Sequence, residues 1–283
     1  MNFVDTCLNH DPNKTAIIDD NGSITYGELK SRVLSINDYQ PGEGDSIDLV
    51  VHMLQQLKNG LYIPIKSSGT TGDPKELLFG DNWLYKAAFS SINHWNFKPD
   101  DILISVAKMH TSAGVLWNFT LPLFLGTTCI LRKKIFSPAV AVGLMREYKP
   151  KVFMSIPWMY ETILKSKEDV SNLPVDICLI GGEDHDVALW HEWEAKTGTT
   201  MNSIYGTTEI MNNCITGDKP GTVGKPIKGG EGKIIDGVLW YKGPTINDFM
   251  CTHDRMHLDD EGYFVFDGRS VPFVKVRGKW TET

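Results

Sequence analysis

Residues 61–76 read LYIPIKSSGTTGDPKE, so an apolar run typical of a buried strand passes directly into a loop of Ser, Thr, Gly and Lys. Backbone N–H groups, hydroxyls and one cation in such a loop form a binding site for an anion. The loop therefore predicts a polyphosphate ligand, with a flexible Ser/Gly/Thr linker as the alternative. Its spacing differs from the Walker loop, which closes with Gly-Lys-Ser/Thr. The predicted anion loop consists of Ser67, Ser68, Gly69, Thr70, Thr71, Gly72 and Lys75.

The composition is that of an ordinary globular protein. The chain has 283 residues, of which 41% are hydrophobic and 22% charged, enough for one large or two smaller domains. A net charge of −7 argues against a nucleic-acid partner held by its phosphates. The five cysteines form no C-x-x-C pair, the N-terminus lacks a signal peptide, and the apolar stretch 115–131 is interrupted and too short to span a bilayer. We therefore expect a cytoplasmic protein without a membrane partner.

Strands and helices are predicted to alternate up to about residue 220. Continuous apolar runs such as KVFMSIP and DICLIGG are typical of a parallel sheet covered on both faces. Thr25 and Glu28 match a capping box, and Ser137-Pro138 matches a helix start. Short β runs and Gly-rich turns then indicate a small β subdomain. The predicted helices are 25–37, 47–59, 82–95, 113–125, 138–148, 157–167 and 186–197, and the predicted strands before residue 220 are 61–65, 102–106, 127–132, 151–156, 176–181 and 201–205.

The order of residues in the anion loop resembles the phosphate loop of the adenylate-forming superfamily, which includes acyl- and aryl-CoA synthetases, nonribosomal-peptide adenylation domains and firefly luciferase. The resemblance implies the α/β fold of the large N-terminal domain of such an enzyme, with 1–220 as a trimmed core, 221–268 as a small β subdomain and 269–283 as a hinge and tail. Further segments resemble motifs of the same family in the same order: ITYGEL (24–29), LKNGLYIPI (57–65), MNSIYGTTE (201–209), GTVGKPIKGGEGKIID (221–236), VLWYKGP (238–244), THD (252–254) and DGRSVPFVKVRG (267–278).

The resemblance also implies an ATP site. In this family, the residue matching Tyr205 packs on adenine, the one matching Asp254 binds the ribose hydroxyls, and Arg269 lies near the same sugar. Thr208 matches a contact to the α-phosphate, and Glu209 matches the acid that binds Mg²⁺. The implied ATP-binding residues are the anion loop together with Gly182, Glu183, Tyr205, Gly206, Thr207, Thr208, Asp254 and Arg269; the implied catalytic residues are Lys75, Thr208 and Glu209.

Each of these assignments has an alternative that the residues leave open. Glu209 could be an acid at the start of a surface helix. Asp254 lies in HDRMHLDDE, a polar segment in which an aspartate could be merely solvated. His253 and His257 are spaced four residues apart and could suggest a metal pair, although a predicted loop favours two solvated side chains.

The acid-binding pocket is placed around KMHTSAG (108–114), where acyl- and aryl-CoA synthetases carry a His or aromatic gate. His110, Gly114 and Ser203 are the residues expected to contact the substrate, with an ordinary strand-end histidine as the alternative for His110. In the amino-acid-activating members of this family an Asp in this region binds the substrate amine. No acidic residue occurs between Lys108 and Thr128, so the resemblance argues against an α-amino acid as the substrate.

Two parts of the family pattern are missing from the sequence. LYIPI runs directly into the anion loop, whereas typical members carry a long segment between these motifs, so we expect a trimmed N-terminal subdomain. The chain stops at GKWTET, without the C-terminal lid domain and the lysine that assists adenylation, and we expect this end to be natural. Pro272 would stiffen the hinge, and neither Lys275 nor Lys279 matches the missing lysine.

The function implied is AMP-forming activation of a carboxylic acid by MgATP, which gives an acyl-adenylate and pyrophosphate. Transfer to coenzyme A or to an acyl-carrier-protein thiol would follow. The alternative is a protein that binds ATP or an acyl-adenylate with impaired catalysis, or a subunit whose partner supplies the missing lysine. Loss of such a charge-stabilising group costs on the order of 10² in rate.

Overall fold

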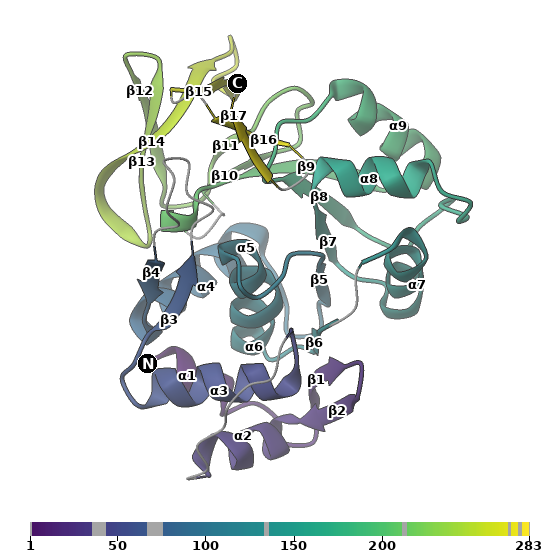
Figure 1. Ribbon diagram of the computed structural model, residues 1–283, viewed down its shortest axis with the longest axis vertical. Helices are drawn as coiled ribbons and strands as arrows, with labels where there is room; N and C mark the ends of the chain where they lie inside the picture. Colours follow the sequence, from purple (N-terminus) through teal and green to yellow (C-terminus); the bar gives the residue numbers. More distant parts are fainter. Residues whose placement is uncertain are drawn as a thin grey trace. The chain divides into compact units, whose positions relative to one another are not determined.

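The computed structural model describes residues 2–35, 44–66, 76–132, 136–210, 214–270, 273–276 and 279–282. The chain forms two compact units (Figure 1). The first contains Met1–Lys66 and Glu76–Phe136, and the second contains Ser137–Thr283. The boundary expected near residue 220 therefore lies inside the second unit, where the chain passes from an α/β arrangement to β structure.

The first unit begins with a short helix and a small sheet. Helix α1 (Phe3–Cys7) precedes β1 (Thr15–Asp19), which pairs antiparallel with β2 (Gly22–Thr25) and parallel with β6 (Cys129–Ile130). Helix α2 (Tyr26–Leu34) follows, and its predicted capping box is confirmed. The amide of Glu28 donates to the Thr25 hydroxyl at 3.2 Å, and the Glu28 carboxylate accepts from the Thr25 amide at 2.8 Å.

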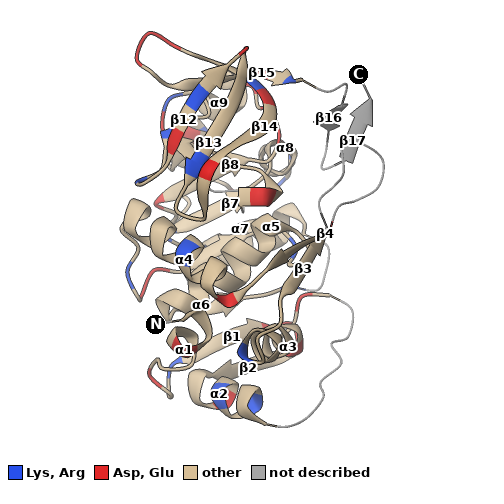
Figure 2. Ribbon diagram, turned by 90° about the vertical axis from the view of Figure 1, so that its left-hand side faces the viewer, with Lys and Arg blue, Asp and Glu red and all other residues tan. Residues whose placement is uncertain are grey.

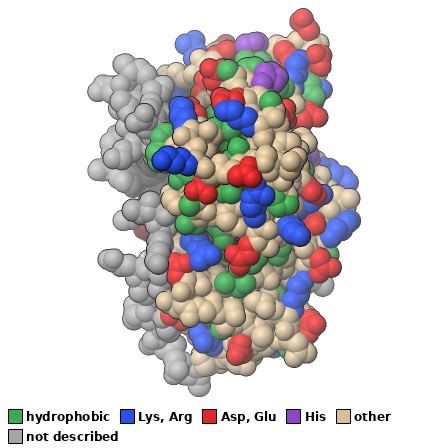
Figure 3. Space-filling model, turned by 90° about the vertical axis from the view of Figure 1, so that its right-hand side faces the viewer, with side chains coloured by type: hydrophobic (Ala, Val, Ile, Leu, Met, Phe, Trp, Pro, Cys, Tyr) green, Lys and Arg blue, Asp and Glu red, His purple; other side chains and the backbone are tan. Residues whose placement is uncertain are grey.

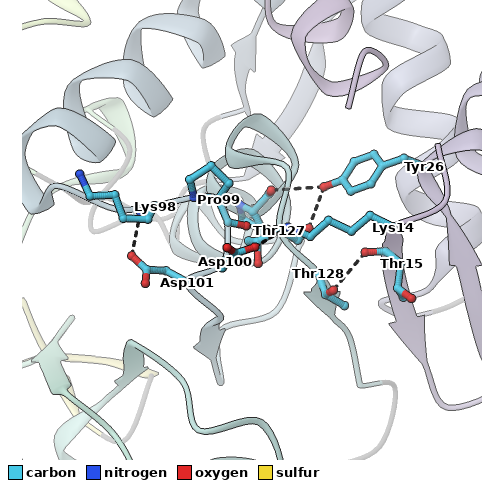
Figure 4. Close-up of polar contacts among 10 residues, drawn as sticks. Lys14, Thr15, Tyr26, Lys98, Pro99, Asp100, Asp101, Thr127 and Thr128 are labelled. Atoms are coloured by element: carbon cyan, nitrogen blue, oxygen red, sulfur yellow. Dashed lines mark hydrogen bonds and ion pairs between the residues drawn. The ribbon is translucent and has the colours of Figure 1, made fainter. Parts of the chain in front are cut away.

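Side chains near this small sheet connect segments that are far apart in the sequence (Figure 4). The Tyr26 hydroxyl donates to the carbonyl of Thr127 at 2.7 Å, and the Thr128 hydroxyl donates to the carbonyl of Thr15 at 3.0 Å. The Lys14 ammonium reaches the carbonyl of Pro99 at 2.8 Å. The first two contacts hold β1 and α2 against the chain around residue 127, and the third holds the residue before β1 against the chain at residue 99.

The remainder of the first unit is mainly helical. Its elements are α3 (Ile47–Lys58), β3 (Ile63–Lys66), β4 (Glu76–Phe79), α4 (Asp81–Trp95), β5 (Leu103–Ser105), α5 (Ser112–Gly114), the π-helix η1 (Val115–Thr120) and α6 (Leu121–Leu125). Strands β3 and β4 form an antiparallel ribbon.

The prediction of one regular α-helix at 113–125 is wrong, because the middle part of this segment is the π-helix η1. All six residues of η1 are buried. Pro122, near the start of α6, has no N–H to donate to the preceding turn, so the hydrogen-bond ladder changes there. A π-helical turn also changes the direction of the side chains that follow, and such turns occur frequently at functional sites.

The second unit is built on parallel strands. Strands β7 (Val152–Ser155), β8 (Ile177–Gly181) and β9 (Thr200–Tyr205) pair in parallel, and α7 (Pro138–Tyr148), α8 (Pro157–Leu164) and α9 (Val187–Thr197) lie beside them (Figure 1). These strands and helices agree with the predicted ranges within one residue at each end, except that α8 ends three residues before the predicted end at 167. The Ser137 hydroxyl caps α7, as predicted, by accepting from the amide of Val140.

Antiparallel strands complete the second unit. The 3₁₀ turn η2 (Thr208–Ile210) follows β9, β10 (Ile215–Gly217) pairs with β9, and β11 (Lys225–Pro226) pairs with β10. A separate sheet has the order β12 (Glu231–Ile235), β13 (Val238–Gly243), β14 (Ile246–Leu258), β15 (Phe264–Arg269), and β16 (Phe273–Val276) pairs with β17 (Lys279–Glu282).

A buried cluster connects η2 and β10 to the antiparallel sheet. Its members are Ile210, Cys214, Ile215, Leu239, Tyr241, Met256 and Phe264. This packing fixes the carboxyl end of β9 relative to β14 and β15. The strands of this sheet carry residues of both charges (Figure 2), and Lys242 on β13 forms a 2.7 Å ion pair with Glu231 on β12.

The surface shows mixed charge. On the face drawn in Figure 3, basic and acidic side chains are interspersed among polar and apolar ones. Within the described residues, none of the helices has the length and apolar character needed to cross a membrane.

Candidate functional site

Three residues predicted to bind the nucleotide meet in the second unit. Tyr205 ends β9, Asp254 lies within β14, and Arg269 ends β15 directly opposite Asp254 in the antiparallel register. The Tyr205 hydroxyl donates to Oδ2 of Asp254 at 2.6 Å, and Nε of Arg269 lies 2.8 Å from Oδ1 of the same carboxylate. Both oxygens of Asp254 therefore have a partner, and each retains a lone pair for a ligand hydroxyl.

The surroundings of Asp254 decide its protonation. Burial raises the pKa of this carboxyl, whereas the Arg269 guanidinium and the Tyr205 hydroxyl lower it. Burial, followed by the nearby Asp254 charge, raises the pKa of Tyr205 well above its ordinary value, so the phenol stays neutral and donates. The backbone amide of Asp254 also donates to the Thr252 hydroxyl at 3.2 Å. The result is a nearly buried, oriented acid, with 6% of its surface exposed.

The expectation that Asp254 occupies a polar loop is wrong. Residues 253–258 belong to β14, in which Thr252, Asp254 and Met256 are buried and alternate with exposed residues. The buried face packs on the core cluster, and this long-range contact outweighs the polar character of the segment.

The two histidines on β14 have separate partners. His253 Nδ1 lies 3.8 Å from Cys251 Sγ, and His257 Nδ1 lies 2.9 Å from Oδ2 of Asp267. Within the part of the chain that the structure describes, His, Cys, Asp and Glu side chains form no group of three or more that could hold a metal ion. The geometry therefore gives no support to a metal pair at His253 and His257.

Thr208 and Glu209 lie in η2, which is separated from the end of β9 by two residues. Thr208 is half-buried and Glu209 is exposed. A single exposed carboxylate suits Mg²⁺, which keeps several waters and binds through one or two carboxylates together with substrate phosphates. Glu209 therefore fits the magnesium role as one ligand of an ion shared with a nucleotide.

Gly181 at the end of β8 and Gly182 just after it allow close packing beside the predicted adenine position. A Cβ on Gly181 would lie 2.1 Å from the carbonyl oxygen of Ile204 on β9, so a side chain is excluded there. Gly182 has φ +83°, a conformation that favours glycine. The exposed Gly182 and half-buried Glu183 thus lie at the carboxyl ends of parallel strands, where ligands bind in open α/β sheets.

The predicted substrate residues are divided between the units. His110 and Gly114 belong to the first unit, and Ser203 belongs to the second. The Ser203 side chain is 1% exposed, and its hydroxyl donates to the carbonyl of Gly217 at 3.2 Å. A Cβ on Gly114 would lie 2.0 Å from the Lys108 carbonyl oxygen. Ser203 and Gly114 therefore have packing roles in the fold, whereas the His110 side chain is exposed.

Residues 56–246 match the family model described as AMP-binding enzyme. The chain belongs to this family. It is 25% identical over 247 residues to the benzoate–CoA ligase of Thauera aromatica, and the alignment covers 75% of this chain and 47% of that protein. It is 28% identical over 188 residues to the mitochondrial malonate–CoA ligase ACSF3 of Mus musculus, which covers 60% of this chain and 32% of that protein. The chain spans about half the length of these curated relatives or less.

Solved structures show that this AMP-binding family member has the predicted fold. A benzoate CoA ligase from Burkholderia xenovorans aligns with a TM-score of 0.82 at 20% identity, covering 95% of this chain and 80% of that chain. The anthranilate CoA ligase AuaEII, in complex with anthranoyl-AMP, aligns with a TM-score of 0.84 at 20% identity, covering 100% of this chain and 80% of that chain. The fold class, the large N-terminal domain of adenylate-forming enzymes, is confirmed.

Part of the predicted site of this AMP-binding family member lies outside the described residues. The whole anion loop, from Ser67 to Lys75, is in this group, as is Pro272. The structure brings Tyr205, Asp254 and Arg269 together, and it places Thr208 and Glu209 shortly after Tyr205 along the chain.

Sequence reasoning missed Asp45, a buried acid that contacts the backbone beside His110. The sequence feature that could have indicated this residue is its position at the end of PGEGD (41–45), directly before Ser46, which caps α3.

Proposed function

We propose that this protein activates a carboxylic acid with MgATP, forming an acyl-adenylate and releasing pyrophosphate. The observation that carries the proposal is the cluster of Tyr205, Asp254 and Arg269, with Glu209 in η2, four residues after Tyr205. An aromatic ring, an oriented carboxylate and an exposed acid supply contacts for adenine, ribose hydroxyls and phosphate-bound Mg²⁺. The relatives named as benzoate– and malonate–CoA ligases support a carboxylic acid substrate.

Each residue of the cluster has a distinct part in binding ATP. The ring of Tyr205 would pack on adenine, while its hydroxyl keeps Asp254 oriented. The remaining lone pairs of Asp254 would accept hydrogen bonds from the ribose hydroxyls, and Arg269 compensates the charge of this buried acid. Gly182 and Glu183 would border the base, next to Gly206 and Thr207.

The chemical step requires the acid and the α-phosphate to be held in line. A carboxylate oxygen forms a bond to the α-phosphorus, and the bond from that phosphorus to the bridging pyrophosphate oxygen breaks. Thr208 would hydrogen-bond the α-phosphate, and Lys75 with the anion loop would hold the β- and γ-phosphates. Mg²⁺ at Glu209 would neutralise charge on the departing pyrophosphate. Correct placement of the two reactants supplies much of the rate, since it replaces a bimolecular encounter.

We also propose that His110 contacts the acid. The exposed imidazole lies just before α5 in the first unit, and its N–H can donate to a carboxylate oxygen. The absence of acidic residues between Lys108 and Thr128 argues against an amine-bearing acid. Transfer of the acyl group to coenzyme A, which the names of the relatives suggest, or to a carrier-protein thiol would follow.

The experiment is ATP–pyrophosphate exchange on the purified chain, with Mg²⁺ and a panel of aryl, short-chain dicarboxylic and long-chain acids. Acid-dependent exchange that falls about 100-fold in Glu209→Ala supports the proposal. Glu192→Ala serves as the control, because Glu192 is a half-exposed acid in α9 paired with Lys196, and exchange should be unchanged. MgATP binding without exchange for any acid would contradict the proposal and favour a nucleotide-binding protein or a subunit that needs a partner's lysine.

A further inference from the structure

The backbone of residues 107–111 is held at several points by the rest of the first unit. The Asn118 side-chain amide, from η1, donates to the carbonyl of Ala107 at 2.6 Å. The Thr111 amide and hydroxyl donate to the carbonyl of Lys108 at 2.9 Å and 2.8 Å. The same carbonyl packs against Gly114, where a Cβ would not fit. The segment is therefore a rigid turn between β5 and α5.

Asp45 supplies a contact from a distant part of the chain. Its Oδ1 accepts from the backbone amide of Met109 at 3.1 Å, across 64 positions in sequence. Its Oδ2 lies 3.9 Å from the Lys108 ammonium, which donates to the carbonyl of Arg132 at 2.5 Å. Asp45 thus contacts both residues that precede His110.

Local structure does not require an acid at position 45. The N-cap of α3 is Ser46, whose hydroxyl accepts from the amide of Leu49, and Asp19 accepts from the amide of Ile47 at 3.1 Å. Asp45 is 5% exposed, and burial raises the pKa of its carboxyl, while the Met109 amide and the charges of Lys108 and His110 lower it. A buried carboxylate costs free energy unless it is paired and hydrogen-bonded, so its contacts to the 107–111 turn explain its presence.

His110 is the most exposed residue of the turn. Within residues 107–111, all of which are described, Met109 is buried, His110 is exposed and the others are intermediate. We propose that Asp45 is a positioning residue for His110, fixing the Lys108–Met109 backbone so that the imidazole is held for the carboxylic acid substrate. This inference rests on the proposed function, because it assigns the acid to His110.

The test combines kinetics with hydrogen–deuterium exchange. In the ATP–pyrophosphate exchange assay, Asp45→Ala should raise the KM for the acid by about 10- to 100-fold, since a small misplacement of a binding group costs this much, and leave the KM for ATP unchanged. Asp45→Asn should restore part of the loss, because an amide oxygen still accepts from Met109. In a His110→Ala background, Asp45→Ala should cause no further rise, because residues acting through one another are not additive.

Asp19→Ala is the matched control. Asp19 is also buried, but its carboxylate accepts from the amides of Asn21, Gly22 and Ile47, the first residue of α3, rather than from the turn. It should lower the melting temperature without changing the KM for the acid. Deuterium uptake in a peptide covering residues 107–111 should rise in Asp45→Ala and not in Asp19→Ala.

The possible failures are distinguishable. A wild-type chain without acid-dependent exchange contradicts the proposed function and with it the assignment of the acid to His110. Unchanged deuterium uptake in Asp45→Ala contradicts the positioning role alone. If Asp45→Ala raises the KM for the acid equally in the wild-type and His110→Ala backgrounds, the positioning role is also contradicted, because the effect of Asp45 would then not depend on His110.

Discussion

The hydroxyl of Tyr205 donates a 2.6 Å hydrogen bond to Oδ2 of Asp254, 49 positions further along the chain. The contact joins the last residue of a strand in the parallel sheet to the middle of a strand in the antiparallel sheet. Tyr205 therefore has two separable features, a ring that can pack on a base and a hydroxyl that orients a buried acid. Its replacement by phenylalanine removes the second and keeps the first.

Tyr205→Phe should weaken MgATP binding about tenfold and lower the free energy of unfolding by about 1.5–3 kcal/mol. The reason is the loss of a hydrogen bond to a buried charged group. Isothermal titration with MgATP and urea denaturation measure the two effects. Tyr160→Phe is the control, because the buried Tyr160 hydroxyl donates to the carbonyls of Phe153 and Leu179. It should lower stability without changing the affinity, and an equal affinity loss in both variants would contradict the role of Tyr205.

Arg269→Gln should change how stability depends on pH. Burial raises the pKa of Asp254 above the ordinary value of about 3.9. A group with a raised pKa in the folded state contributes stability that is complete below its unfolded pKa and lost as the pH rises through its folded pKa. Removing the Arg269 cation raises this pKa further, so the loss should become larger and extend to higher pH. Urea denaturation at a series of pH values between about 4 and 7 measures it.

The control for Arg269 is Arg146→Gln. Arg146 pairs with the exposed Asp169 at 3.4 Å, and exposed pairs contribute little. Its stability curve should run parallel to that of the wild type. The raised pKa of Asp45 affects all three proteins equally, so differences between the curves report on Asp254. A curve for Arg269→Gln that is parallel to the wild type would show that the ion pair does not control Asp254.

Gly114→Ala should destabilise the protein by about 1–3 kcal/mol, the usual cost of overpacking. Its Cβ would lie 2.0 Å from the Lys108 carbonyl oxygen, so the backbone must move. Gly143→Ala provides the opposite case. Gly143 lies inside helix α7, and an added Cβ would have no neighbouring atom outside the helix backbone within 4 Å. That change should stabilise by about 0.5–1 kcal/mol through helix propensity. Thermal unfolding distinguishes them, and a neutral Gly114→Ala would contradict the packing role.

Thr25→Ala should lower the free energy of unfolding by about 1 kcal/mol, because the alanine cannot accept from the amide of Glu28 at the start of α2. Ser31→Ala in the same helix removes a hydroxyl that donates to the carbonyl of Gly27 and should be close to neutral or stabilising. Urea denaturation compares the two. Equal losses would indicate that the capping box contributes nothing beyond a general hydroxyl effect.

The sequence predicted well those elements whose signals are local. The helix at 138–148 agrees residue for residue with α7, and the strands at 151–156, 176–181 and 201–205 agree within one residue at each end with β7, β8 and β9. Caps, proline at a helix start and continuous apolar runs act over a few residues. The sequence analysis missed β1 and β2. It also treated residues 253–261 as a polar loop, although residues 253–258 belong to β14, a strand that is stabilised by packing on the buried cluster.

The sequence alone determined the family, the α/β core and the identity of the residues proposed to bind ATP, because the order of motifs along the chain carries that information. The tertiary structure decided which of them interact. Local patterns could not pair Tyr205 with Asp254 or Asp254 with Arg269, and they could not show that Asp45 reaches Met109. These contacts depend on how strands and turns far apart in sequence pack into one core, a property of the whole fold that short-range spacing does not encode.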